Sequence, residues 1–137
     1  MIDPLGTLLT EIRDNAAVAA LTTRIRGGEP APGDAALPFG RFVVLVRLGS
    51  QRHKRAPVQE VRIALRCYGT SYADAAALYG AVSDAIHNVG PRIGATGVLI
   101  HRSFDDIGMG AERDPATGQP HEDGVISLFA ATSAVTA

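Results

Sequence analysis

The chain has 137 residues, of which 46% are hydrophobic and 20% charged, and its formal net charge at pH 7 is −1. This length and composition predict one globular domain over residues 1–137, and the near-neutral charge excludes a domain that binds nucleic acid through an overall positive surface. A single cysteine, Cys67, excludes an internal disulfide and a cysteine metal cluster, and we expect it to be buried as a small hydrophobic residue. The chain has neither a signal-peptide pattern nor a long apolar stretch, which predicts a protein assembled in the cytoplasm without a membrane span.

The N-terminal half predicts one helix followed by a β-hairpin. An Asp-Pro cap and apolar residues at helical spacing predict an amphipathic helix over about residues 4–20. The stretch 27–38 is rich in proline and glycine and predicts a loop. The apolar run 41–48 predicts a strand buried on both faces, whereas 58–68 alternates and predicts a strand with one polar face.

The C-terminal half predicts a second helix and a second pair of strands. Residues 71–86 are rich in alanine and begin with Ser71 in a capping-box pattern, which predicts a helix. Strands are expected at 97–104 and 124–133, with a polar, turn-prone loop over 105–123.

The order helix, strand, strand, helix, strand, strand predicts an α+β fold. We expect two helices packed on one face of a mostly antiparallel four-stranded sheet, with a mixed sheet as the open alternative.

The expected hairpin has a basic tip, 51-QRHKR-55, which contains Arg52, Lys54 and Arg55. The spacing alone favours a solvated turn, in which like charges discourage edge-to-edge pairing of sheets. Contact with an acidic partner or with nucleic acid is the alternative.

The residue types of catalytic and metal sites occur without the required spacing. His101 precedes Asp105 and Asp106, and His121 precedes Glu122 and Asp123, but none of these sets lies at the fixed spacing of a helical metal site. Gly108 and Gly110 lack a strand–turn–helix unit, and no nucleophile-elbow motif is present. We therefore expect no catalytic, cofactor-binding or metal residues, and no enzyme; a small enzyme or ligand-binding domain stays the further alternative and requires a pocket with converging polar groups.

Four segments carry a resemblance to a known family: 17-AVAALTTRI-25, 35-AALPFGRFVVLV-46, 71-SYADAAALYGAVSDAI-86 and 113-RDPATGQPHEDGVISLFAAT-132. In this order they resemble the tail terminator (tail completion) proteins of long-tailed bacteriophages, the lambda-U-like and minor-capsid-like group. The resemblance covers nearly the whole chain, although no single residue is diagnostic. Neck, or head-to-tail connector, proteins of the same virions share parts of this layout.

The resemblance implies a homo-hexameric ring at the head-proximal end of the virion tail. Such a ring caps the tail tube, ends its polymerisation and joins the tail to the head connector. The implied partners are other copies of the chain, the tail tube protein and the connector or neck protein, and genomic DNA passes through the lumen without tight binding. A neck connector ring is the alternative function.

A closed ring needs two different complementary patches on each subunit. One candidate patch is the polar face of the second strand, formed by Glu60, Arg62 and Arg66. Its expected counterpart is a pair of acidic loops, which contain Asp105, Asp106, Glu122 and Asp123. The basic tip is expected to line the lumen or to dock on an acidic rim of the tube or connector, because arginines make bidentate contacts with carboxylates.

Overall fold

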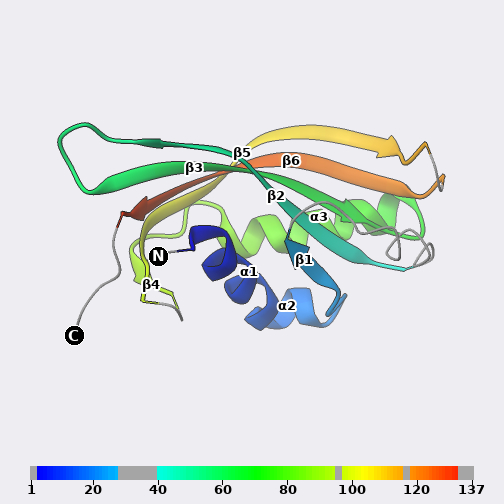
Figure 1. Cartoon of the computed structure of the whole chain (residues 1–137). Helices are drawn as coiled ribbons and strands as arrows, with labels where there is room; N and C mark the ends of the chain where they lie inside the picture. Colours follow the sequence, from blue (N-terminus) through cyan, green and yellow to red (C-terminus); the bar gives the residue numbers. More distant parts are fainter. Residues whose placement is uncertain (1–2, 28–39, 95–96, 116–117, 133–137) are drawn as a thin grey trace.

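The computed structural model describes residues 3–27, 40–94, 97–115 and 118–132, which form one mixed six-stranded sheet with helices on one of its faces (Figure 1). The helices are α1 (Pro4–Asp14), α2 (Ala16–Ala19) and α3 (Tyr72–Ile86). The strands are β1 (Ile25–Gly27), β2 (Phe42–Arg52), β3 (Val58–Tyr68), β4 (Arg92–Ile93), β5 (Leu99–Arg113) and β6 (Pro120–Ala131). They lie in the order β1-β2-β3-β6-β5-β4, and only the β1–β2 pair in this sheet is parallel. None of the helices in the described residues is long and apolar enough to cross a membrane.

The α+β class and the mixed, mainly antiparallel sheet are confirmed, but the expected numbers of strands and helices are wrong. The sheet gains two short outer strands, β1 and β4, which are too short to show a periodicity in the sequence. The single helix expected over 4–20 is two helices. It breaks at Asn15, whose side chain accepts hydrogen bonds from the backbone N–H groups of Ala17 and Val18 and so starts a new helix.

The loop expected over 105–123 is wrong, because most of it continues β5 and β6. These two strands pair along almost their whole length, with register shifts that place bulges near Asp106 and Met109. Glycine-rich, polar sequence is typical of turns, but here pairing with β6 and two bulges allow β5 to continue as a strand. The loop expected over 27–38 lies almost entirely outside the described residues.

The hydrophobic core lies between the helices and the sheet. The alternation expected along β3 is confirmed: its helix-facing side chains are fully or almost fully buried, and they are Val61, Ile63, Leu65 and Cys67. They pack with Leu8 and Ile12 of α1 and with Leu78, Val82 and Ile86 of α3. Cys67 is a buried core residue, as expected, and its burial raises the pKa of its thiol. The opposite face of the sheet, called here the open face, carries the other side chains of each strand.

The Asp74 carboxylate connects the start of α3 to Arg41, the residue before β2. Ser71 Oγ accepts a hydrogen bond from the Asp74 backbone N–H, as the capping pattern predicts. The Asp74 side chain accepts from the Thr70 backbone N–H and, at 2.7 Å, from Nε of Arg41. Burial alone would raise the pKa of Asp74, but these contacts with Thr70 and Arg41 outweigh it and lower the pKa below its ordinary value.

Replacing Asp74 with Asn should therefore destabilise the fold in a pH-dependent way. At pH 7 we expect a loss of about 1 kcal/mol in the free energy of unfolding, because a cap and a charge-assisted hydrogen bond are weakened. Because the pKa of Asp74 is lowered in the folded state, its carboxylate stabilises the fold fully at pH values above its pKa in the unfolded chain. This stabilisation is lost as the pH falls through its pKa in the folded state. Urea unfolding of both proteins should thus show a difference that shrinks below about pH 4, and a constant difference would contradict this.

Candidate assembly surface

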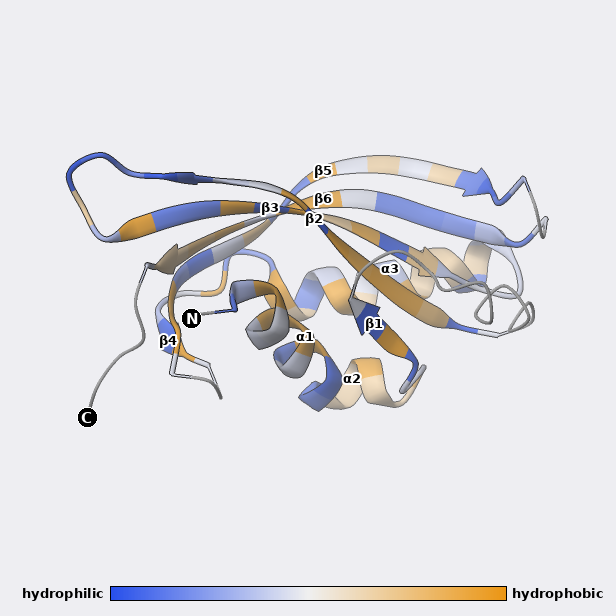
Figure 2. Cartoon of the chain, in the orientation of Figure 1, coloured by the Kyte–Doolittle hydropathy of each residue, from blue (hydrophilic) through white to orange (hydrophobic). Residues whose placement is uncertain are grey.

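The β2–β3 hairpin extends past the helices as a projecting arm (Figure 1). Residues 47–57, called here the hairpin arm, are all exposed. Figure 2 shows that the tip of this arm is strongly hydrophilic, whereas the first half of β2 is apolar. The hairpin expected from the sequence is confirmed, and its tip has no packing role in the described part of the chain.

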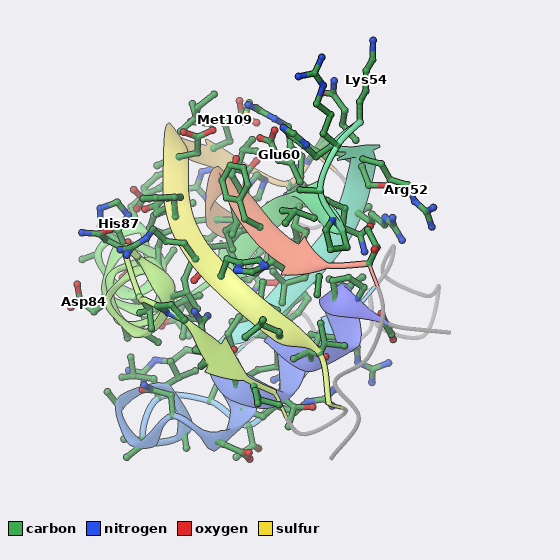
Figure 3. The ribbon with its side chains drawn as sticks, turned by 90° about the vertical axis from the view of Figure 1, so that its left-hand side faces the viewer. Arg52, Lys54, Glu60, Asp84, His87 and Met109 are labelled. Carbon is green, nitrogen blue, oxygen red and sulfur yellow. The ribbon has the colours of Figure 1, made fainter. Side chains whose placement is uncertain are left out.

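The charges at the tip of the hairpin arm are available for a partner. Arg52 and Lys54 point outward from the ribbon (Figure 3). Within the described residues, neither these two side chains nor Arg55 forms an ion pair. Two hydrogen bonds within the hairpin hold the turn: the His53 N–H donates to the Val58 carbonyl, and His53 Nδ1 accepts from the Arg55 N–H.

The charges in the middle of the open face pair within the chain. Arg62 lies 3.5 Å from a Glu60 carboxylate oxygen and 3.4 Å from one of Asp106. Asp106 also accepts a hydrogen bond of 3.0 Å from the Ser127 hydroxyl. Arg62 and Asp106, which were expected to meet across a subunit boundary, are thus already partners inside one subunit, and both remain partly exposed.

A second ion-pair group lies on the open face further from the tip. Arg66 donates to both carboxylate oxygens of Asp123, at 3.1 and 3.3 Å, and His121 Nδ1 lies 2.7 Å from the same carboxylate. Burial alone would lower the pKa of Arg66, but contacts with Tyr68 and Asp123 raise it above its ordinary value. Arg66 therefore stays charged and holds Asp123 in place.

This group contains a set of side chains that could hold a metal ion. Ligand atoms of Glu112, His121 and Asp123 lie within 4.8 Å of one another. However, both oxygens of Asp123 are taken by Arg66, and a divalent cation there would be repelled by the neighbouring guanidinium group. The arrangement favours an ion-pair network over a metal centre.

Asp105 lies on the other side of the sheet from Asp106. Its carboxylate accepts hydrogen bonds from the Tyr79 hydroxyl at 2.7 Å and from the Ser83 hydroxyl at 2.8 Å, both on α3. Burial, followed by the contact with Asp105, raises the pKa of Tyr79. The expected acidic loops are therefore wrong in two respects: their residues are on strands, and Asp105 joins the sheet to a helix. Glu122 of β6 lies opposite Cys67 of the neighbouring strand β3, so it is likewise on the helix side of the sheet.

An apolar groove of about 420 Å³ crosses the open face. Val46 and Leu48 of β2 line one side, Met109 of β5 lines the other, and Ala64 and Val125 lie between them. Met109 and the tip of the hairpin arm stand on opposite sides of this face (Figure 3). Sequence reasoning missed this groove, because Met109 was assigned to a turn.

Two comparisons relate the chain to known proteins, one by family and one by fold. The model of a family described as "Tail completion protein gp17" matches residues 6–119. A chain in a solved structure described as the virion of a native gene transfer agent (GTA) particle is similar at a TM-score of 0.65 and 19% identity, covering 90% of this chain and 91% of that chain. At this identity, the likeness shows a shared fold. A search of curated proteins finds no match.

The two neighbouring acids of β5 should have different effects when each is replaced by alanine. Asp105→Ala leaves two hydroxyl groups of α3 without their acceptor, so we expect a loss of about 2 kcal/mol in the free energy of unfolding. Asp106→Ala removes a partly exposed ion pair and should cost less than about 1 kcal/mol. Denaturant unfolding measures both, and equal losses would show that Asp105 does not join the sheet to α3.

Proposed function

Because the chain belongs to the tail completion protein gp17 family and is a structural protein of phage tails, we propose that it forms a ring that caps the tail tube. The ring ends tube polymerisation and joins the tail to the head connector. The observation that carries this proposal is the family match over residues 6–119, which covers most of α1, all of α2 and α3, and every strand except β6. The ring consists of copies of this chain, most simply six of them, and DNA passes through its lumen.

The surface supports a role in assembly more strongly than a role in catalysis. The groove on the open face is mainly apolar, and its charged members, Arg66 and Asp123, neutralise each other. A catalytic site needs converging polar groups that are free to act on a substrate. The groove does not offer them. An apolar groove and a cationic arm whose tip forms no ion pair within the described residues suit protein–protein contacts.

The hairpin arm is the proposed contact to the rest of the virion. Every subunit of a ring repeats the arm, so its cations gather at one level of the assembly. Arg52 and Arg55 can make bidentate contacts with carboxylates, which suits an acidic rim of the tail tube or connector. The net charge of −1 keeps the rest of the ring from holding DNA tightly during its passage.

The capping role can be tested on purified protein. We expect native mass spectrometry and negative-stain images to show closed rings, and rings added to tubes of the virion's own tail tube protein to occupy one tube end and stop elongation. Bare tube ends at all protein concentrations would refute capping. Binding to the portal or adaptor in place of the tube would show the neck connector function.

The arm can be tested by removing its charges. The triple variant Arg52→Gln, Lys54→Gln, Arg55→Gln should fold normally, because these side chains are exposed, but should bind its tube or connector at least 10-fold more weakly. The matched control is Ala73→Glu, Ala76→Glu, Ala77→Glu on the exposed side of α3, which lowers the net charge by the same amount. Titration at low and high salt measures both, and equal weakening in the two variants would assign the effect to net charge and not to the arm.

A further inference from the structure

Two stretches of sheet edge have no neighbouring strand among the described residues. On one edge, β1 pairs with Val43–Leu45, so no described residue pairs with the outer edge of β2 from residue 46 to 52; this stretch and its counterpart on β5 are called here the uncovered edges. On the other edge, β4 pairs with Leu99 and Ile100. Beyond β4, the Asn88 N–H donates to the Ser103 carbonyl, and His87 Nδ1 accepts from the Asp105 N–H. No described residue pairs with the outer edge of β5 from 107 to 113.

These two uncovered edges carry large apolar side chains in solvent. Leu48 of β2 is 59% exposed, and Ile107 and Met109 of β5 are 49% and 64% exposed. All three lie on the open face, since Leu48 and Met109 line its groove and Ile107 pairs with Val125. Bulges and charges normally protect an edge from pairing. Here Leu48 and Met109 occupy bulged positions. These bulges therefore expose apolar side chains in place of charges that would oppose strand pairing.

The charges of the two edges are complementary. The uncovered part of β2 contains Arg47 and Arg52 and no acid. The uncovered part of β5 contains Glu112, which is exposed. Arg113 also lies there, but its guanidinium group turns onto the Tyr72 ring and donates to the Gly118 carbonyl. Arg47 and Arg52 lie opposite Ile63 and Gln59 on the helix side of the sheet, and Arg47 donates to Ser50 Oγ. Glu112, in contrast, lies opposite His121 on the open face. The opposite charges of the two edges therefore attract over a distance and do not form a direct cross-strand pair.

The strand directions suit pairing between copies in one orientation. Successive antiparallel pairs β2–β3, β3–β6 and β6–β5 make β2 and β5 run in opposite directions. The β2 edge lies toward the hairpin tip and the β5 edge toward the other end of the sheet, so neighbouring copies would be staggered along the strands. The contact is heterologous, which is the kind that closes into rings.

We propose that the uncovered edge of β2 in one copy pairs, antiparallel, with the uncovered edge of β5 in the next copy. This inference rests on the ring proposed above and specifies its subunit interface. Backbone hydrogen bonds continue the sheet across the boundary, and Leu48 packs with Ile107 or Met109 of the neighbouring copy on the open face.

Cysteine cross-linking tests this contact directly. Two double variants, Leu48→Cys with Met109→Cys and Leu48→Cys with Ile107→Cys, cover the two registers that place these residues opposite each other. The native Cys67 is buried, and burial raises the pKa of its thiol, so it does not compete. Within one copy, β3 and β6 separate β2 from β5 by about 14 Å, which exceeds the reach of a disulfide.

Under mild oxidation, one of the two double variants should give a ladder of covalent oligomers on a denaturing gel. A mixture of Leu48→Cys and the matching single β5 variant should stop at dimers, because each copy then carries one cysteine at the contact. The control, Leu48→Cys with Ala17→Cys, places the second cysteine at an exposed position of α2 away from both sheet edges and should stay monomeric on the gel.

Each other outcome overturns the proposal in a distinct way. Closed rings without cross-links in either double variant would refute the edge contact and leave the capping function intact. Dimers of Leu48→Cys alone would show β2 meeting β2, a contact that cannot build the ring. A chain that stays monomeric, both alone and on tail tubes, would refute the ring and the edge contact together.

Discussion

The uninterrupted pairing of β3 with β6 is the constraint on which the rest of the structure depends. The whole of β3, Val58–Tyr68, pairs with β6 without a register shift. Because side chains alternate between the faces of a strand, a slip of one residue would move every core residue of β3 into solvent. The buried row from Val61 to Cys67 fixes the register, and the register in turn fixes which charges share the open face.

The outer strands differ from this regular centre. β2 contains one register shift and β5 contains three, and each strand extends beyond the short strand that covers part of its outer side. The bulges turn Leu48 and Met109 onto the open face, where they flank the apolar groove. The regular centre therefore gives stability, while the irregular margins supply exposed apolar and charged groups for assembly.

The parts of the fold that the sequence predicted are those in which one strand or helix carries its own signal. The alternation of 58–68, the basic tip and the Ser71 cap are local patterns, and all three elements are present. The strand over 105–113 could not be predicted, because glycines and acids give a turn signal unless the pairing with β6 is known. For the same reason, Asp105 and Asp106 were assigned to one patch although adjacent strand residues face opposite sides.

The pairing of the open-face charges also bears on where partners bind. Arg62 and Arg66 have carboxylate partners in their own chain, so a new contact would first have to break those pairs and would gain little. The cations of the hairpin arm have no such competitor in the described residues, and they are held away from the helices. A long-range attraction to an acidic rim therefore acts at the arm, while short-range apolar and backbone contacts act at the sheet margins. This division lets one small, nearly neutral subunit bind its copies along the sheet and its target at the tip without attracting the DNA that passes through.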